Sequence, residues 1–410
     1  MSRDRVLGSI AVLIGVLPFV SGCEPNVPAT DTAVREDAVT ARSLTDKERL
    51  GRHLFFDTNL SEPRGQACAS CHGADVGFTG PSAAVNKTTV VYPGAVPTRF
   101  GNRKPPAAAY APSAALFALD PATGTFSGGN FWDGRATGEK LGNPAADQAQ
   151  GPFLNPLEQN NPSAAAVVGK VCASSYASLF LRVWGNDACA DTARAYDFIG
   201  LSIAAYEASS EVSAFSSKYD AWQAGRAKLS GPERRGLALF QGKAKCANCH
   251  VPPLFTDFSF DNLGVPRNPS NPFYSETDVN PAGEAWVDPG LGGFLATRSE
   301  WASLAGANMG KQQVPTLRNV DKRPRPSFVK AYAHNGYFKS LKSIVHFYNT
   351  RDVLPTCSAV AVAAAGKNCW PAPEVSENVN RTELGNLGLS AHEEDDLVAF
   401  LETLSDGYGR

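Results

Sequence analysis

The sequence predicts a mainly α-helical protein of two related domains with long loops. The first reason is an internal repeat: the pentapeptide CASCH at 68–72 has the same form as CANCH at 246–250. The second reason is that each pentapeptide follows a segment of one pattern, TDKERLGRHLFF at 45–56 and SGPERRGLALFQ at 230–241, with Glu, Arg, Gly, Leu and Phe in register. Two copies of one structural unit explain both observations.

Each copy is predicted to begin with an amphipathic helix. Thr45 with Glu48, and Ser230 with Glu233, form capping boxes, in which a hydroxyl and a carboxylate three residues later bind the first free N–H groups. The apolar residues that follow fall on one helical face in each copy, namely Leu50, Leu54, Leu237 and Phe240.

Helices are also predicted to close both domains. Residues 192–222 carry helical periodicity and end the first domain. A third capping box, Ser390 with Glu393, begins the last helix. The apolar stripe of that helix is Leu397, Phe400, Leu401 and Leu404. The first domain is therefore expected at 45–225 and the second at 226–410.

The composition is that of a globular protein and excludes several other classes. With 410 residues, the chain is long enough for two domains. Hydrophobic residues at 43% and charged residues at 19% argue against disorder and against a multi-spanning membrane fold. A formal net charge of −2, without any run of lysine or arginine, predicts no nucleic-acid partner. Long loops are expected at 92–130, 261–315 and 351–382.

Residues 1–22 are predicted to be a signal peptide of the lipoprotein type. Arg3 and Arg5 precede an apolar run that is too short to count as a membrane span. Small residues before Cys23 resemble the bacterial lipobox, which implies a lipid on the Cys23 thiol and a linker at 23–44. The alternative is an ordinary secretory signal with a chance cysteine. In both cases we expect the mature chain in the periplasm or at the cell surface, and the lipid would anchor it to the bacterial membrane.

Four cysteines remain outside the repeat and the N-terminus. In an oxidising compartment, disulfides are the default for such residues. Proximity in sequence favours the pairs Cys172–Cys189 and Cys357–Cys369, each of which closes a short loop. A further metal site is the alternative, but no histidine lies near these cysteines.

The repeated CxxCH pentapeptide indicates a cofactor. Two cysteines alone could be half a zinc site or a redox dithiol, but zinc needs further ligands at matched spacing and thioredoxin-like chemistry needs a βαβ context. Cysteines followed directly by histidine are typical of covalent haem attachment, in which the histidine binds the iron. Two c-type haems are therefore predicted, with His72 and His250 as proximal ligands. The thioether positions are Cys68, Cys71, Cys246 and Cys249.

Nearly all of the mature chain resembles the bacterial di-haem cytochrome c peroxidase and MauG superfamily. The matching stretches, in order, are LGRHLFFDTNLS before CASCH, FWDGRATG at 131–138, QAQGPFLNPLE at 148–158, VPTLRNV at 314–320 and KAYAHNG at 330–336. The resemblance implies two cytochrome c-like helical domains, each with one covalent c-type haem. It also implies a calcium ion and a tryptophan between the haems.

The same resemblance implies roles for five residues. Gln148 and Glu158 match the distal pair above the first haem, where a carboxylate can move a proton of peroxide and an amide can orient it. Trp132 matches the tryptophan that relays electrons between the haems. Without the family motif, the first two would be polar residues of a Pro-rich turn, and Trp132 a core aromatic residue. Asn102 and Thr316 fall in regions that supply calcium ligands, although such loop residues usually satisfy backbone groups.

Two departures from the family pattern concern the far sides of the haems. No histidine occurs between His72 and His250, so we expect the first haem to be open to peroxide without activation. Ala333 stands where relatives place a methionine or tyrosine that binds the second haem, and a methyl group cannot bind iron. We expect another side chain to serve as the sixth ligand, and the candidates are Met309, Tyr332, His334 and Tyr337.

The resemblance implies that hydrogen peroxide is reduced at the first haem and leaves a high-valent di-haem state. In one interpretation this state oxidises a residue of a partner protein. The stretches RATGEKLGNPAADQAQGP, KAYAHNG and FYNTRD are similar to the MauG-like MbnH and CorB group, where that residue is a tryptophan of a copper-binding protein. In the alternative, a small cytochrome c or cupredoxin supplies electrons and the protein removes peroxide. A non-enzymatic di-haem electron carrier is a third interpretation.

Overall fold

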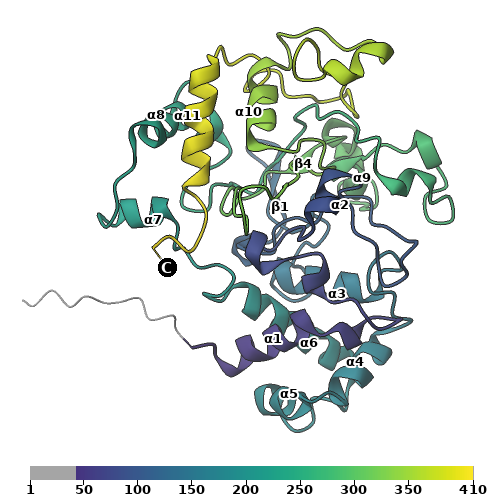
Figure 1. Ribbon diagram of the computed structural model, residues 1–410. Coiled ribbons are helices and arrows are strands. Elements are labelled where there is room, and N and C mark those ends of the chain that lie inside the picture. Colours follow the sequence, from purple (N-terminus) through teal and green to yellow (C-terminus); the bar gives the residue numbers. More distant parts are fainter. Residues whose placement is uncertain (1–42, 410) are drawn as a thin grey trace, which may run out of the picture. The chain divides into compact units, whose positions relative to one another are not determined.

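The computed structural model describes residues 43–409, which form a mainly α-helical fold with long loops, as predicted (Figure 1). The predicted signal peptide, Cys23 and most of the linker lie outside the described residues. The helices are α1 (Asp46–Phe56), α2 (Ala83–Lys87), α3 (Pro144–Leu154), α4 (Ala164–Cys172), α5 (Ala177–Trp184), α6 (Thr192–Glu207), α7 (Lys218–Gln223), α8 (Gly231–Gln241), α9 (Gly290–Leu295), α10 (Leu341–Thr350) and α11 (Ala391–Glu402). The short strands β1 (Ala118–Asp120) and β2 (Thr125–Ser127) pair antiparallel, as do β3 (Phe260–Asp261) and β4 (Gln312–Gln313).

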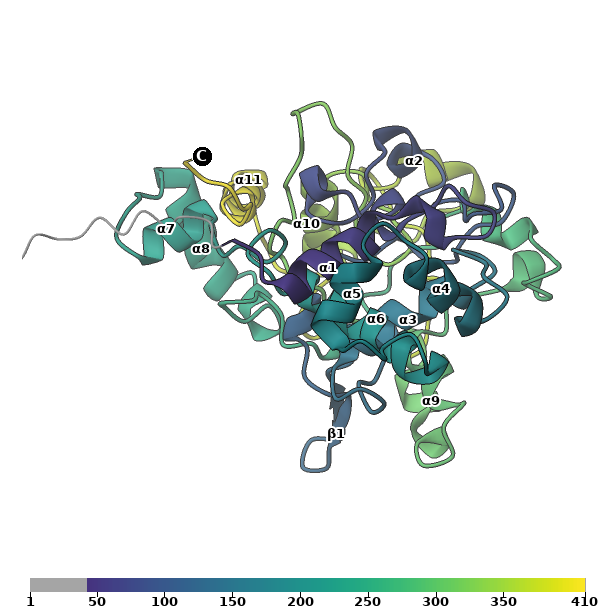
Figure 2. The same cartoon turned by 90° about the horizontal axis from the view of Figure 1, so that it is seen from below.

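The sequence repeat is also a repeat in helix packing. Helix α1 crosses α6, and α8 crosses α11 (Figures 1 and 2). Both crossings depend on a glycine in register within the repeat. A Cβ atom on Gly51 would lie 1.9 Å from the carbonyl oxygen of Ser202, and one on Gly236 would lie 1.9 Å from that of Asp396. Only glycine allows backbones to approach so closely.

All three predicted capping boxes are confirmed. The side chains of Thr45, Ser230 and Ser390 each accept a hydrogen bond from the backbone N–H three residues later. The glutamate at that later position accepts a second hydrogen bond from the backbone N–H of the capping residue. Both predicted disulfides, Cys172–Cys189 and Cys357–Cys369, are present. Within residues 43–409, no single helix is long and apolar enough to cross a membrane. Helices α4 and α5 pass that test only as a pair bent by 105°.

The periodic segment at 192–222 is not one helix. Helix α6 ends at Glu207, where the hydroxyl of Ser213 donates to the free Glu207 carbonyl oxygen at 2.8 Å and accepts from the backbone N–H of Tyr110. Helix α7 follows after a loop and packs in the second apolar core, where Tyr219 contacts Phe255 and Phe400. This helix lies before residue 225, the expected boundary, but its contacts are with the second half of the chain.

A buried cation joins the two halves of the chain. Arg318, which is 1% exposed, forms two hydrogen bonds to the Asp220 carboxylate at 2.9 and 2.7 Å. Its guanidinium carbon lies 5.2 Å from the ring centre of Tyr110 and 4.4 Å from that of Phe215. The Tyr110 hydroxyl donates to Asp406 at 2.7 Å. These contacts hold a loop of the first half against the second half.

Candidate functional site

The two CxxCH segments fold in the same way. Each begins with a 3-10 turn. The backbone N–H of His72 then binds the carbonyl oxygen of Cys68 at 3.0 Å, and that of His250 binds Cys246 at 2.9 Å. The four thiols of these segments take part in no disulfide. The turns therefore present two thiols and one imidazole together, as covalent haem attachment requires.

Both histidines use one ring nitrogen for orientation. Nδ1 of His72 lies 3.0 Å from the carbonyl oxygen of Phe78, and Nδ1 of His250 lies 2.9 Å from that of Phe255. Because a carbonyl oxygen only accepts hydrogen bonds, Nδ1 carries the proton and Nε2 keeps its lone pair. Burial lowers the pKa of both imidazoles and so favours their neutral form. Both side chains fit the role of proximal ligand to a haem iron.

The first cavity brings together the first CxxCH segment, Gln148 and Glu158. Gln148 lies on α3, and Glu158 lies in the turn after that helix, where Asn155 Nδ2 donates to its carboxylate at 2.8 Å. Burial raises the pKa of the Glu158 carboxyl, which suits a group that exchanges protons. Among the described residues, His72 is the only histidine that lines this cavity.

Trp132 lines both the first and the second cavity. Its indole is 7% exposed, and its Nε1–H donates to the carbonyl oxygen of Lys104 at 2.8 Å. Lys104 also lines both cavities, and its Nζ donates to Thr79 Oγ1 at 2.9 Å and to the Pro105 carbonyl oxygen at 3.1 Å. Burial lowers the pKa of this lysine to about 8. The structure thus places Trp132 between the two predicted haem sites.

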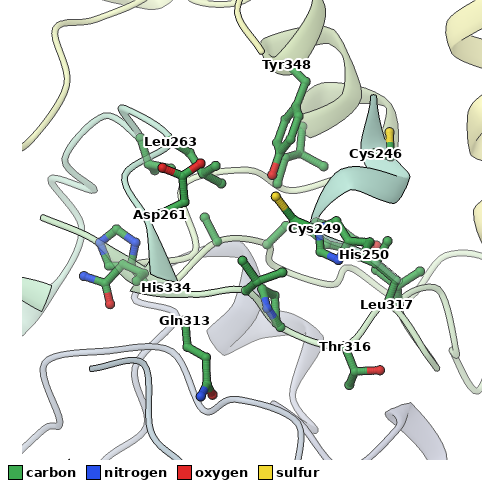
Figure 3. Close-up of a pocket in the computed structure, with 18 of the residues that line it drawn as sticks. Cys246, Cys249, His250, Asp261, Leu263, Gln313, Thr316, Leu317, His334 and Tyr348 are labelled. Carbon is green, nitrogen blue, oxygen red and sulfur yellow. The ribbon is translucent and has the colours of Figure 1, made fainter. Parts of the chain in front are cut away.

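The second cavity contains the second CxxCH segment and several polar side chains (Figure 3). Of the four candidate distal ligands, Tyr332 and His334 line this cavity, whereas Met309 and Tyr337 are not among its lining residues. Met309 instead packs on α9, where a Cβ atom on Gly292 would lie 2.7 Å from its sulfur. The side chain of Tyr337 packs edge-to-face on Phe338.

His334 lies on the Trp132 side of the second cavity. Its ring centre is 6.3 Å from that of Trp132. Its Nε2 lies 3.7 Å from a Glu374 oxygen and 3.9 Å from an Asp288 oxygen, and it makes no hydrogen bond to any described residue. The side chain is 9% exposed. A buried ring nitrogen without a partner is available to a group that occupies the cavity.

Sequence reasoning missed Tyr348, which comes from α10 and directs its hydroxyl into the second cavity near Asp261 and Cys249 (Figure 3). Burial raises the pKa of this phenol, and the nearby Cys246 and Asp261 raise it further. A pattern in the sequence could have indicated it. The residues of α10 that line the cavity recur at helical spacing, as Leu341, Ile344, Val345 and Tyr348.

The two residues predicted to bind calcium, Asn102 and Thr316, both line the first cavity. The Thr316 hydroxyl donates to the Leu254 carbonyl oxygen at 2.6 Å and accepts from the Arg318 backbone N–H. The carbonyl oxygen of Asn102 accepts from Asn271 Nδ2 at 2.9 Å. Within residues 43–409, no three His, Cys, Asp or Glu side chains gather as a metal site. Calcium binding at these two residues stays a prediction.

Comparisons with known proteins agree with these features. The family described as di-haem cytochrome c peroxidase matches residues 45–228. The methylamine utilization protein MauG of Paracoccus denitrificans (strain Pd 1222) is 32% identical, over 99% of this chain and 96% of that protein. The diheme peroxidase BthA of Burkholderia thailandensis E264 is 31% identical in its crystal structure, with a TM-score of 0.71 over 89% of this chain and 87% of that chain.

A third comparison supports the fold alone. The crystal structure of a MauG-like protein associated with microbial copper homeostasis is 22% identical, with a TM-score of 0.62 over 90% of this chain and 91% of that chain. The near-complete match to MauG and the two histidine sites lead to one conclusion. The chain belongs to the di-haem cytochrome c peroxidase and MauG family and is a haem peroxidase.

Proposed function

We propose that the protein uses hydrogen peroxide at the first haem site to oxidise a residue of a partner protein, a tryptophan of a copper-binding protein. The observation that carries this proposal is the position of Trp132, which lines both cavities while Gln148 and Glu158 line only the first. This arrangement separates a place for peroxide chemistry from a second redox site and provides an oxidisable ring between them.

The bound haem irons supply the redox chemistry, and the side chains of the chain control protons and access. Glu158, whose pKa is raised by burial, accepts a proton from peroxide at one oxygen and returns it to the other. Gln148 orients the peroxide through its amide. The indole N–H of Trp132 is fixed on the Lys104 carbonyl oxygen, which holds the ring in one orientation.

Oxidation of a partner protein is favoured over peroxide removal by two observations. His72 is the only histidine among the described residues that line the first cavity, so none of these side chains blocks it as a second imidazole ligand. A protein named MauG is 32% identical over nearly the whole chain, which is consistent with a related activity. The alternative, peroxide removal with electrons from a small cytochrome c or cupredoxin, uses the same first site.

The test is a reaction of the purified di-haem protein with hydrogen peroxide, with and without a candidate copper-binding protein from the same organism. Mass spectrometry of the partner should show oxygen added at a tryptophan only when all components are present. A reduced small cytochrome c, offered in parallel, should be oxidised slowly. Rapid cytochrome oxidation with an unmodified partner would instead establish the alternative. A protein whose haems do not respond to peroxide would be an electron carrier.

We further propose that the second haem keeps a side chain as its sixth ligand, and that the ligand is His334 or Tyr332. Both line the second cavity, and His334 has a ring nitrogen without a partner. Resonance Raman and electron paramagnetic spectra of the wild type should show one high-spin and one low-spin haem. His334→Ala or Tyr332→Phe should convert the second to high spin, and two high-spin haems in the wild type would refute the proposal.

We also propose that the protein is an exported lipoprotein, held to the bacterial membrane through Cys23. The two disulfides support an oxidising compartment. Cys23→Ser should move the haem protein from the membrane fraction to the soluble periplasmic fraction. An unchanged distribution would argue against the lipid anchor.

A further inference from the structure

Tyr348 is the polar residue on an otherwise apolar face of α10. The other residues of this helix that line the second cavity are Leu341, Ile344 and Val345. The hydroxyl of Tyr348 points into the cavity (Figure 3) and makes no hydrogen bond to any described residue. Buried hydroxyl groups normally have a hydrogen-bond partner. A phenol that is turned toward the haem site without one therefore indicates a role in the chemistry of that site.

The phenol lies on the side of the second cavity that is far from the first cavity. Gln313 and Thr316 line both cavities, and in Figure 3 they lie opposite Tyr348. Tyr348 itself lines only the second cavity. Its hydroxyl lies beside Cys249, one of the two thioether positions (Figure 3). An oxidising equivalent that leaves the first site through Trp132 would therefore reach the second haem before it reaches Tyr348.

A buried carboxylate near the phenol can accept its proton. Asp261, at the end of β3, also lines the second cavity and lies near the Tyr348 hydroxyl (Figure 3). It accepts a hydrogen bond from Asn380 Nδ2 at 2.7 Å, and the same amide donates to Glu383 at 2.8 Å. Burial raises the pKa of the Asp261 carboxyl, and the bond from Asn380 opposes this shift. Asp261 is thus a stronger base than an exposed aspartate.

The position of this base determines what oxidation of the phenol would produce. Burial raises the pKa of Tyr348, so the phenol is neutral before it reacts. Removal of an electron alone would leave a positive charge in a buried place, which costs much free energy. Transfer of the proton to Asp261 in the same step avoids that charge and leaves two neutral groups.

We propose that Tyr348 is a redox-active residue that holds one oxidising equivalent beside the second haem. After peroxide has oxidised the di-haem centre, Tyr348 gives one electron to the second haem. Its O–H bond breaks, the proton passes to the Asp261 carboxylate, and a neutral tyrosyl radical remains. One electron leaves the tyrosine, and one oxidising equivalent of the haem is consumed. This role rests on the proposed relay through Trp132, and it is the same whether a partner protein or a small donor finally returns the electron.

The direct test is rapid freeze-quench electron paramagnetic resonance of the di-haem protein mixed with hydrogen peroxide, without any partner or donor. We expect an organic radical whose spectrum narrows when the protein contains ring-deuterated tyrosine. Stopped-flow absorption follows both haems in parallel. Oxidation of both haems without a tyrosyl radical would overturn the proposal alone. A second haem that never changes its absorption would overturn both the proposal and the relay through Trp132.

A substitution assigns the radical to its residue. Tyr348→Phe should abolish the tyrosyl signal and lengthen the lifetime of the oxidised haem bands, while the spin states of the resting haems stay unchanged. Tyr219→Phe is the matched control, since Tyr219 is a buried phenol that lines neither cavity and accepts a hydrogen bond from Gln223 at 2.7 Å. A radical that persists in Tyr348→Phe, or that disappears in Tyr219→Phe, would contradict the assignment.

A second substitution tests the proton acceptor. Asp261→Asn keeps the size of the side chain but removes its basicity, so radical formation should slow by about 10²-fold, the lower end of what a positioned base contributes. The wild type should form the radical more slowly in D2O, because an O–H bond breaks in that step. Formation at the wild-type rate in Asp261→Asn would exclude this residue as the base. The same variant decides the proposal if Tyr348→Phe does not fold.

Discussion

The indole N–H of Trp132 donates to the carbonyl oxygen of Lys104 at 2.8 Å, and both residues line both cavities. Trp132→Phe keeps an aromatic ring but removes this bond and the easily oxidised indole. We expect peroxide to react at the first haem as before while the second haem no longer changes its absorption. Stopped-flow spectra at both haems measure this. Trp184→Phe, which lies outside both cavities, should leave the response of the second haem intact.

Glu158 is expected to limit the rate of the peroxide reaction. Glu158→Gln should slow it by about 10²–10⁴-fold, because the neutral amide cannot take up a proton. Since burial raises the pKa of this carboxyl above its usual value, the wild-type rate should rise with pH as the group ionises, and the variant should lose this rise. Glu62→Gln, at an exposed carboxylate of the same half, is the control. A rate that follows the same pH profile in Glu158→Gln would exclude the role.

Substitutions of two glutamines of α3 should have different effects, one on the rate of the peroxide reaction and the other on the stability of the fold. Gln148 lines the first cavity, whereas Gln150 donates to the Tyr196 carbonyl oxygen at 3.0 Å and to Asp197 at 2.9 Å. Gln148→Leu should slow the peroxide reaction with little change in stability. Gln150→Leu should lower the free energy of unfolding by about 1–3 kcal/mol and leave the rate unchanged. Urea unfolding measures the stability of both variants, and peroxide kinetics measure their reaction rates. A slow but stable Gln150→Leu, or a fast but unstable Gln148→Leu, would contradict these roles.

A buried carboxyl at the end of α6 should make stability depend on pH. Burial raises the pKa of Glu207 from 4.5 to about 8. Because the folded state holds this proton more tightly than the unfolded state, its contribution is complete below about pH 4.5 and is lost as the pH rises to about 8. The upper limit is about 5 kcal/mol, at about 1.4 kcal/mol for each pKa unit. Glu207→Gln should flatten this part of the stability profile, whereas Glu211→Gln, at an exposed ion pair, should not.

A glycine-to-alanine substitution should destabilise the two helix crossings to a similar extent. Gly51→Ala and Gly236→Ala should each lower the free energy of unfolding by about 1–3 kcal/mol or more, because the new Cβ overlaps a carbonyl oxygen. Gly169→Ala on α4 has open space around it and should stabilise the protein by about 0.5–1 kcal/mol, as alanine favours a helix. Thermal unfolding measures all three, and a tolerated Gly51→Ala would show that the helices can move apart.

Short-range patterns in the sequence predicted much of the fold and of the haem attachment. A capping box such as Thr45 with Glu48 is complete within one helical turn, so its residues alone determine the helix start. CxxCH likewise places both thiols and the imidazole within five residues. The break after Glu207 has no such local pattern, and the Ser213 hydroxyl that binds the Glu207 carbonyl oxygen is itself held by Tyr110, which is distant in sequence.

Long-range contacts explain what could not be predicted about the site. Arg103 meets Asp288 across 185 positions, and no local pattern relates the two. Ala333 indicated that the expected ligand is missing, but only the fold shows that Met309 packs on α9 while Tyr332 and His334 line the second cavity. Which side of a loop faces a cavity depends on the packing of the whole domain.

The matching hydrogen bonds of His72 and His250 have a consequence for the reduction potentials of the two irons. Each imidazole donates Nδ1–H to a phenylalanine carbonyl oxygen, at 3.0 and 2.9 Å, so this hydrogen bond does not distinguish the two proximal ligands. A difference in potential between the haems must then originate on their opposite faces and in the charges around them. Substitutions at positions such as Glu158 and Ala333 can therefore change the relative reduction potentials of the two irons. The duplicated attachment turn can stay unchanged while this happens.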